Sequence, residues 1–326
     1  FWLKYRQMDA ERAVDQLASL HECHGVSRFF LSQSLMNGDL AWLKRFAEIM
    51  RERSLSYHWG GNIRIHPKMD ETYLQTLYEG GCRLGFFGIE SGSDRVLESM
   101  RKGVRAEHCS RVLRDAAATG LWVHTYWIFG FPGETENDLL QSVDFLIGNF
   151  DAISSFYIHK YNAPPNLDNI RAGNMVEYVA LTSIYDTPVS DFYRANSKPL
   201  SLFISMLNEY ATFDLAGEQG IVSSCFERPP TGDTPNRRCA LILLHLLKRY
   251  LASPLERASM QVIFTREWFE RLLQDVCKIA LGGQQPTDND AMQAFLTGQL
   301  SDGAPRLESH DLDKRGLVGV KVSRSS

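Results

Sequence analysis

The 326-residue chain contains few cysteines, and those it has are far apart. They occupy positions 23, 82, 109, 225, 239 and 277, so no two lie within four residues of each other. Thiols this dispersed do not build a disulfide scaffold in a protein of this length, and we expect a reducing, cytoplasmic setting. His21, Cys23 and His24 stand together at a predicted helix end, but no second cluster lies at ligand spacing. We therefore assign no metal site within the chain.

Long apolar runs and an excess of one charge are also missing. The longest apolar stretch, from Cys239 to Leu247, is interrupted by His245 and is far shorter than the roughly 20 residues of a membrane span. The 35 basic and 39 acidic residues give a formal net charge of −4, which provides no electrostatic footprint for a nucleic-acid backbone. We expect a globular protein that neither crosses a membrane nor binds nucleic acid.

The first 160 residues alternate between short strands and amphipathic helices. Strand-like runs centre near residues 29, 61, 86, 125 and 156, and a helical pattern lies between each pair. Asp9, Asp39, Asp70 and Thr135 are placed to cap helices. This alternation predicts right-handed βα units and a parallel sheet, either a barrel or a doubly wound layer. In both, the functional residues lie at the carboxyl ends of the strands.

The alternation stops after residue 160, where the patterns become mostly helical. Residues 238–251 and 267–280 give the clearest helices, and residues 301–326 have the polar composition typical of a mobile tail. We divide the chain into a partial barrel at 1–160, a helical C-terminal region at 161–281 and a polar tail at 282–326.

Two predicted strand ends carry residues that indicate a site. An unpaired carboxylate at the end of a buried strand is costly, so Glu90 either binds a ligand or pairs with a neighbour such as Arg64. Residues 126–135, YWIFGFPGET, end the next strand with glycines. These either let the backbone approach a planar ligand or simply form a βα turn. Residues 101–103 either reach an anionic group or form a solvated basic loop.

Together, these segments resemble the radical S-adenosylmethionine (radical SAM) superfamily, in the subgroup that carries an upstream cobalamin-binding domain. The resemblance covers roughly residues 4–160. It rests on residues 88–93 (GIESGS), 100–103 (MRKG), Gly120 and 128–135 (IFGFPGET). It implies a partial (βα)6, TIM-like barrel of parallel strands whose first strand is missing here, followed by the mostly helical region.

The resemblance also implies the chemistry. The cofactors would be S-adenosylmethionine and a 4Fe-4S cluster, with cobalamin supplied by an upstream domain. Reductive cleavage of the sulfonium would yield a 5′-deoxyadenosyl radical, which abstracts hydrogen or supports cobalamin-dependent methyl transfer to a small metabolite or peptide. An electron donor such as flavodoxin or ferredoxin would be the protein partner.

The cofactor-binding residues that the resemblance implies are Ser32, Gln33, Arg64, Glu90, Ser91, Lys102, Ile128 and Gly130. Glu90 would contact the ribose or the amino group, and Arg64 and Lys102 would lie near the methionine carboxylate. No catalytic residue is assigned.

The other implied contacts lie at two further strand ends. The backbone around Ile128 and Gly130 would flank the adenine. Ser32 and Gln33 correspond to the motif that binds the methionyl amine, although the paired glycines and glutamate usual there are absent.

The larger departure from the family concerns the iron ligands. Members hold the cluster with C-x-x-x-C-x-x-C after the first strand, because thiolates are the iron ligands, and no such triplet occurs here. The chain is then either truncated, with the cluster cysteines upstream of Phe1, or a degenerate, non-catalytic barrel that binds a ligand or partner. The start at Phe1 and the run Lys4-Tyr5-Arg6 favour truncation, and the fragment alone is expected to be inactive.

A third hypothesis is a metal-independent enzyme that uses Glu90 and Arg64 as an acid–base pair. It ranks last, because the sequence places no nucleophile or orienting histidine beside them.

Overall fold

The structure is a computed structural model that describes residues 7–32, 35–162, 189–211 and 234–261. All of these residues belong to the first of two compact units, residues 1–277; the second, residues 278–326, lies outside the described residues. The helix predicted at 267–280 and the predicted tail also lie outside them. The domain boundaries at residues 160 and 281 stay predictions.

Five parallel strands form one sheet, and their order in space follows the chain. They are β1 (Arg28–Leu31), β2 (His58–Ile63), β3 (Cys82–Glu90), β4 (Trp122–Phe129) and β5 (Ser155–Lys160). Every connection between them contains a helix, as a parallel crossover requires. The predicted α/β class is confirmed, and the sheet is open in the described residues, since β1 and β5 each pair on one side only.

Six helices belong to the βα part of the chain and four to the described C-terminal part. The first group is α1 (Ala10–His24), α2 (Leu40–Glu52), α3 (Glu71–Glu79), α4 (Asp94–Ser99), α5 (Ala106–Ala118) and α6 (Glu136–Gly148), with the short 3-10 helix η1 (Phe150–Ala152) after it. The second group is α9 (Asp191–Ala195), α10 (Ser197–Ala211), α12 (Pro235–Ala252) and α13 (Pro254–Gln261). The described residues after β5 are therefore mostly helical, as expected. Helix α4 was not predicted, because six residues are too few to reveal a helical period.

Short polar residues begin the helices as expected. Asp9, Asp39 and Asp70 each accept backbone N–H groups at the first turns of α1, α2 and α3. Thr135 and Asp138 form a capping box at the start of α6. Such caps satisfy amides that the helix leaves unpaired.

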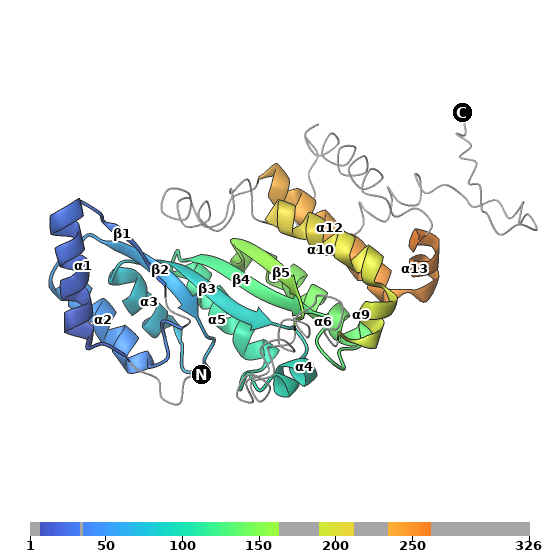
Figure 1. The fold of residues 1–326 in the computed structure, drawn as a ribbon, viewed down its shortest axis with the longest axis horizontal. Coiled ribbons are helices and arrows are strands. Elements are labelled where there is room, and N and C mark those ends of the chain that lie inside the picture. The colour runs from blue at the N-terminus through green and yellow to red at the C-terminus, as the bar shows by residue number, and fades with distance from the viewer. Residues whose placement is uncertain (1–6, 33–34, 163–188, 212–233, 262–326) are drawn as a thin grey trace, which may run out of the picture. The chain divides into compact units, whose positions relative to one another are not determined.

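The main core lies between the sheet and the helices that follow its strands. Trp59 of β2 meets Phe46 of α2 with ring centroids 5.1 Å apart, and Trp127 of β4 meets Phe145 of α6 at 5.4 Å. Helices α1, α2, α3 and α5 pack side by side in that order (Figure 1). Burial of these large rings supplies much of the free energy of folding.

The C-terminal helices cover the β5 side of the sheet. Helix α10 packs against β5 and α12, and α12 packs against α6 (Figure 1). Asn208 of α10 accepts from the Ile158 amide at 2.7 Å and donates to the Ile158 carbonyl at 2.8 Å. Arg237 of α12 donates to the carbonyls of Phe150 and Ile153. These contacts fasten the helical region to the end of the sheet.

None of the described helices is long and apolar enough to cross a membrane.

The close approach of β2 and β3 at Gly60 gives a test of the register between these two strands. A Cβ at Gly60 would lie 2.5 Å from the Leu84 carbonyl oxygen, so we expect Gly60→Ala to lower the free energy of unfolding by about 1–3 kcal/mol. The control is Gly148→Ala in α6, where a Cβ meets nothing within 4 Å, and the change should be neutral or stabilising. Urea unfolding of both variants measures this. Equal stability of the two would contradict the β2–β3 register.

Candidate functional site

A cavity of about 520 Å³ lies at the carboxyl ends of β2, β3 and β4. The residues that line it are Leu35, Asn62, Ile63, Arg64, Phe86, Gly88, Glu90, Met100, Arg101, Lys102 and Tyr126. It occupies the edge of the sheet where parallel α/β proteins place their sites. Three of the predicted site residues, Arg64, Glu90 and Lys102, meet there.

Glu90 and Lys102 form an ion pair at this cavity. The Lys102 Nζ lies 3.1 Å from the Glu90 Oε1, and both side chains are only partly exposed. Glu90 has a φ of 70°, and the pairing with β4 shifts register between Gly88 and Glu90. A Cβ at Gly88 would lie 2.6 Å from the same Oε1. The missing side chain at Gly88 therefore makes room for the carboxylate.

Arg64 contacts the backbone of the loop that carries Lys102, and it does so through its guanidinium group. Its Nη2 donates to the Lys102 carbonyl at 2.7 Å and reaches the Arg101 carbonyl at 3.4 Å. Asn37, in the loop after β1, accepts from the Arg64 amide at 2.9 Å and donates to the Arg64 carbonyl at 2.7 Å. Lys102, not Arg64, is thus the ion-pair partner of Glu90, which removes the basis for an acid–base pair of Glu90 and Arg64.

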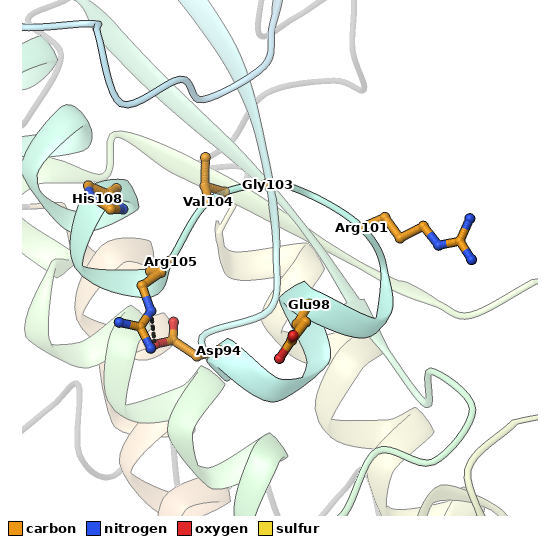
Figure 2. Close-up of a pocket in the computed structure, with 7 residues that line it drawn as sticks. All are labelled: Asp94, Glu98, Arg101, Gly103, Val104, Arg105 and His108. Carbon is orange, nitrogen blue, oxygen red and sulfur yellow. Dashed lines mark ion pairs between the residues drawn. The ribbon is translucent and has the colours of Figure 1, made fainter.

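A second cavity, of about 490 Å³, is lined by residues of α4, of the loop at residues 101–105 and of the start of α5 (Figure 2). Asp94 anchors this loop, because it pairs with the Arg105 Nε at 3.3 Å and accepts from the Ala106 amide at 2.7 Å. In Figure 2, Arg101 extends away from that pair, and it lines both cavities. Positive φ angles at Arg101 and Gly103 turn the chain between these contacts.

Gly130 begins a tight turn at the end of β4. Its φ is 86°, its amide donates to the Glu134 Oε2 at 2.6 Å, and its carbonyl accepts from the Ser190 amide at 2.9 Å. A Cβ there would lie 3.0 Å from the Tyr193 ring of α9. Glycine is required both by the left-handed conformation and by this packing.

Glu134 is almost fully buried, at 3% exposure, and its Oε1 has no hydrogen-bond partner among the described residues. Burial raises the pKa of Glu134 to about 8, although the Gly130 amide opposes the shift. At neutral pH the carboxyl is therefore mostly protonated.

Asp138, four residues later, is buried in a hydrogen-bonded network. It accepts from the Ser93 hydroxyl at 2.6 Å, from the Thr135 amide at 2.8 Å and from the Arg95 guanidinium. Burial by itself would raise the pKa of Asp138, but the hydrogen bonds from Arg95, Ser93 and Thr135 outweigh it and hold that pKa well below its usual value. Arg95 also donates to the Gly133 carbonyl at 2.7 Å. The network thus fastens the loop after β3 to the loop after β4.

The remaining predicted residues lie elsewhere. Ser91 is buried, and its Oγ lies 3.1 Å from the Ser142 Oγ of α6, which places the side chain away from the cavity. Ile128 is half-buried in β4 opposite His159 of β5. Ser32 is exposed after β1, and Gln33 lies outside the described residues.

Sequence reasoning missed the residues that position the site. No sequence signal shows that the Asn37 side chain hydrogen-bonds the backbone of Arg64. The capping-box spacing of Thr135 and Asp138 indicates a helix start, but it does not reveal the contacts with Ser93 and Arg95. The burial of Glu134 depends on packing between distant segments and cannot be read from GFPGET alone.

Comparison with known proteins identifies the segment that carries this site. Residues 1–146 match the family model described as the radical SAM superfamily. The match to this superfamily covers 146 of the 326 residues. The resemblance of residues 88–103 and 128–135 to that superfamily is thereby confirmed.

The similar proteins include radical SAM enzymes and methyltransferases. An uncharacterized methyltransferase of Pyrococcus horikoshii is 28% identical over 149 residues, covering 44% of this chain and 31% of the relative. Cytidylyl-2-hydroxyethylphosphonate methyltransferase of Streptomyces wedmorensis is 27% identical over 153 residues, covering 44% and 28%. The structure of the radical S-adenosylmethionine methyltransferase TsrM from Kitasatospora setae, with cobalamin and a 4Fe-4S cluster bound, matches at a TM-score of 0.43 and 20% identity, covering 47% and 31%. The chain spans about a third of the length of these curated relatives.

The Asp138 network gives a test of how the radical SAM loops are held. Asp138→Asn removes a charged acceptor from several donors, so we expect a loss of about 2–3 kcal/mol in the free energy of unfolding. Amides of residues 91–95 and 130–135 should also exchange hydrogen faster. The control is Asp144→Asn on the same helix, which breaks only a surface pair with Lys248 at 2.8 Å and should cost under about 1 kcal/mol. Equal effects of the two changes would contradict the network.

The neutral state of Glu134 predicts a pH dependence of stability. Its pKa of about 8 in the folded protein exceeds the ordinary 4.5, so the folded state holds a proton that the unfolded chain releases between these values. Stability should therefore fall as the pH rises from about 4.5 to about 8 and then level off. The glutamine in Glu134→Gln cannot titrate, so the variant should lack this fall in stability with pH. Melting temperatures measured from pH 5 to pH 9 test this. The exposed Glu107→Gln serves as control, and a slope unchanged in Glu134→Gln would show that Glu134 is ionised.

Proposed function

We propose that this chain supplies the S-adenosylmethionine-binding sheet of a radical SAM enzyme. The observation that carries the proposal is the Glu90–Lys102 ion pair, 3.1 Å long, at a cavity on the carboxyl edge of the sheet within the radical SAM segment. A carboxylate and two cationic side chains match a ligand that has both an ammonium and a carboxylate group.

Each group in the cavity has a separate task in this proposal. Glu90 accepts hydrogen bonds from the ribose hydroxyls or from the methionyl ammonium. Lys102 offsets the charge of Glu90 and, with Arg64, attracts the methionine carboxylate. Because Arg64 is fixed by Asn37 and by the Lys102 carbonyl, the two cations stay in place before the ligand arrives.

The turn after β4 provides a flat backbone surface. Neutral Glu134 holds the Gly130 amide, and Gly130 carries no side chain that would block a ring. In the proposal the backbone of Ile128 and Gly130 lies beside the adenine, while Ser32 and Gln33 lie near the methionyl amine. When bound, S-adenosylmethionine would supply a 5′-deoxyadenosyl radical, with release of methionine, once an electron from a donor outside this chain reduces its sulfonium; the methyl group of the unreduced sulfonium would be the source for methyl transfer.

The residues present do not fit a 4Fe-4S cluster. Among the described residues no three histidines, cysteines or carboxylates group together as metal ligands, and the buried cysteines Cys82, Cys109 and Cys239 lie on three different elements. The full sequence has no C-x-x-x-C-x-x-C triplet. In this proposal the cluster ligands therefore come from residues outside the 326, and no step of the mechanism here passes through the cluster.

The wider assignment follows the same reasoning. We propose residues 1–160 as the partial barrel, 161–281 as the helical region that closes one side of it, and 282–326 as a polar tail. Cobalamin-dependent methyl transfer to a small metabolite or peptide, an electron donor such as flavodoxin or ferredoxin, and a cytoplasmic location complete the proposal.

Gly88 gives a test of the cofactor site that leaves the fold intact. An added methyl would meet the mobile end of Glu90 rather than backbone, so Gly88→Ala should hardly change the melting temperature. It should weaken S-adenosylmethionine binding about tenfold by displacing the carboxylate, as should Glu90→Gln. Isothermal titration calorimetry measures both, with Gly148→Ala as control. Undiminished affinity in Gly88→Ala and Glu90→Gln would exclude Glu90 as a ligand.

The activity itself is tested with protein expressed from the reading frame extended upstream of Phe1. After anaerobic reconstitution with iron and sulfide and reduction with dithionite, the proposal expects 5′-deoxyadenosine or a methylated product. If the extension contains no three-cysteine loop and no cleavage of S-adenosylmethionine occurs, the chain is a non-catalytic binding barrel.

A further inference from the structure

One face of the sheet carries aromatic rings that the proposed cofactor site uses only in part. Neighbouring positions in register on parallel strands point to the same face. The register aligns Gly88 with Tyr126 and Tyr157, and Ile128 with His159. Five of the rings on this face are Phe30, Phe86, Tyr126, Tyr157 and His159, which we call the ring row; His124 lies on the same face, two residues before Tyr126.

The rings contact each other from β1 to β5. Phe30 meets Phe86 with centroids 5.5 Å apart, and Phe86 lies nearly parallel to Tyr126, at 5.7 Å and 15°. Tyr126 meets His159 at 5.6 Å, and His159 meets Tyr157 at 4.6 Å. Phe86 and Tyr126 also line the cavity that holds Glu90. The ring row is thus continuous with the cofactor site.

A buried histidine, His124, lies beside the centre of the ring row. His124 is 1% exposed and lies 4.8 Å from both the Phe86 and the Tyr126 ring. Its Nδ1 contacts the Ser155 Oγ at 2.7 Å, and that oxygen also accepts from the Trp122 indole at 3.0 Å. Burial lowers the pKa of His124 to about 3, so the imidazole stays neutral. Tyr126 therefore has a buried, neutral ring beside it on the same face.

The two ends of the row are open. Phe30 is 39% exposed and Tyr157 is 38% exposed, and His159 is also exposed. Large rings left accessible beside a cavity are typical of a ligand site, because binding recovers the apolar surface that folding leaves in water. Stacking on several rings favours a flat ligand over a saturated one.

Charge at the cavity narrows the ligand class. Three cations, Arg64, Arg101 and Lys102, face one carboxylate, Glu90. This balance disfavours a cationic ring and favours a neutral or anionic one.

We propose that the ring row binds the substrate, and that the substrate is a planar, conjugated ring compound that is neutral or carries a carboxylate. This inference rests on the proposed function, since it places the ring beside the S-adenosylmethionine cavity. Tyr157 and Phe30 hold the two ends of the ring system, and Tyr126 holds the part nearest the cofactor.

The test compares two carboxylates of equal charge on the upstream-extended protein. The probes are 2-naphthoate, which is planar, and its fully saturated decalin analogue. Calorimetry should show 2-naphthoate binding at least tenfold more tightly than the analogue. Because 2-naphthoate is shorter than the ring row, at least one of Tyr157→Leu and Phe30→Leu, which keep apolar bulk but remove a ring, should weaken its binding about five- to tenfold. Trp42→Leu, in the helix layer on the other side of the sheet, is the control and should leave binding unchanged.

The outcomes separate this inference from the proposed function. Equal affinity for the planar and saturated acids, or unchanged 2-naphthoate binding in both ring variants, overturns the inference. S-adenosylmethionine is titrated in parallel, and its affinity should stay within twofold in Tyr157→Leu and Phe30→Leu. If 2-naphthoate binding passes these tests but S-adenosylmethionine does not bind the unaltered protein, the proposed function fails and the ring row stands as a ligand site.

Discussion

The Asp138 carboxylate is the interaction on which the arrangement of the site depends. It is 2% exposed, yet it stays ionised because Arg95, Ser93 and Thr135 donate to it. Removing a charge from water is costly unless every lone pair is used, so the donors cannot drift without a large loss of free energy. Since the donors come from Ser93 and α4 on one side and from the start of α6 on the other, one side chain ties the segment that follows Glu90 to the segment that follows Gly130.

Glu134 lies four residues before Asp138 and is equally buried, but it has the opposite protonation state. The difference comes from partners, because Glu134 accepts one backbone amide while Asp138 accepts from a guanidinium and two hydroxyls. The turn between β4 and α6 thus holds a neutral acid beside the backbone of Gly130 and a charged one against Arg95.

The sequence predicted the elements well because their signals are local. Asp9, Asp39 and Asp70 begin helices through contacts with residues two or three positions away. The alternation of strand-like runs with helical patterns predicts parallel strands. The site was predicted only in part. Glu90 stays at the cavity with Phe86 and Gly88 despite a register shift between Gly88 and Glu90, whereas the Ser91 side chain turns toward α6. No local pattern predicts such a bulge, nor that Lys102 rather than Arg64 reaches Glu90.

The position of Asn208 determines whether a further strand can pair with β5. Its amide group occupies both the N–H and the carbonyl of Ile158 on the side of β5 away from β4, which are the groups that another strand would need there. A sixth strand cannot add to β5 at this point unless α10 moves first. Helix α10 therefore covers the β5 edge where a further strand would pair, and the described sheet stays open on this side.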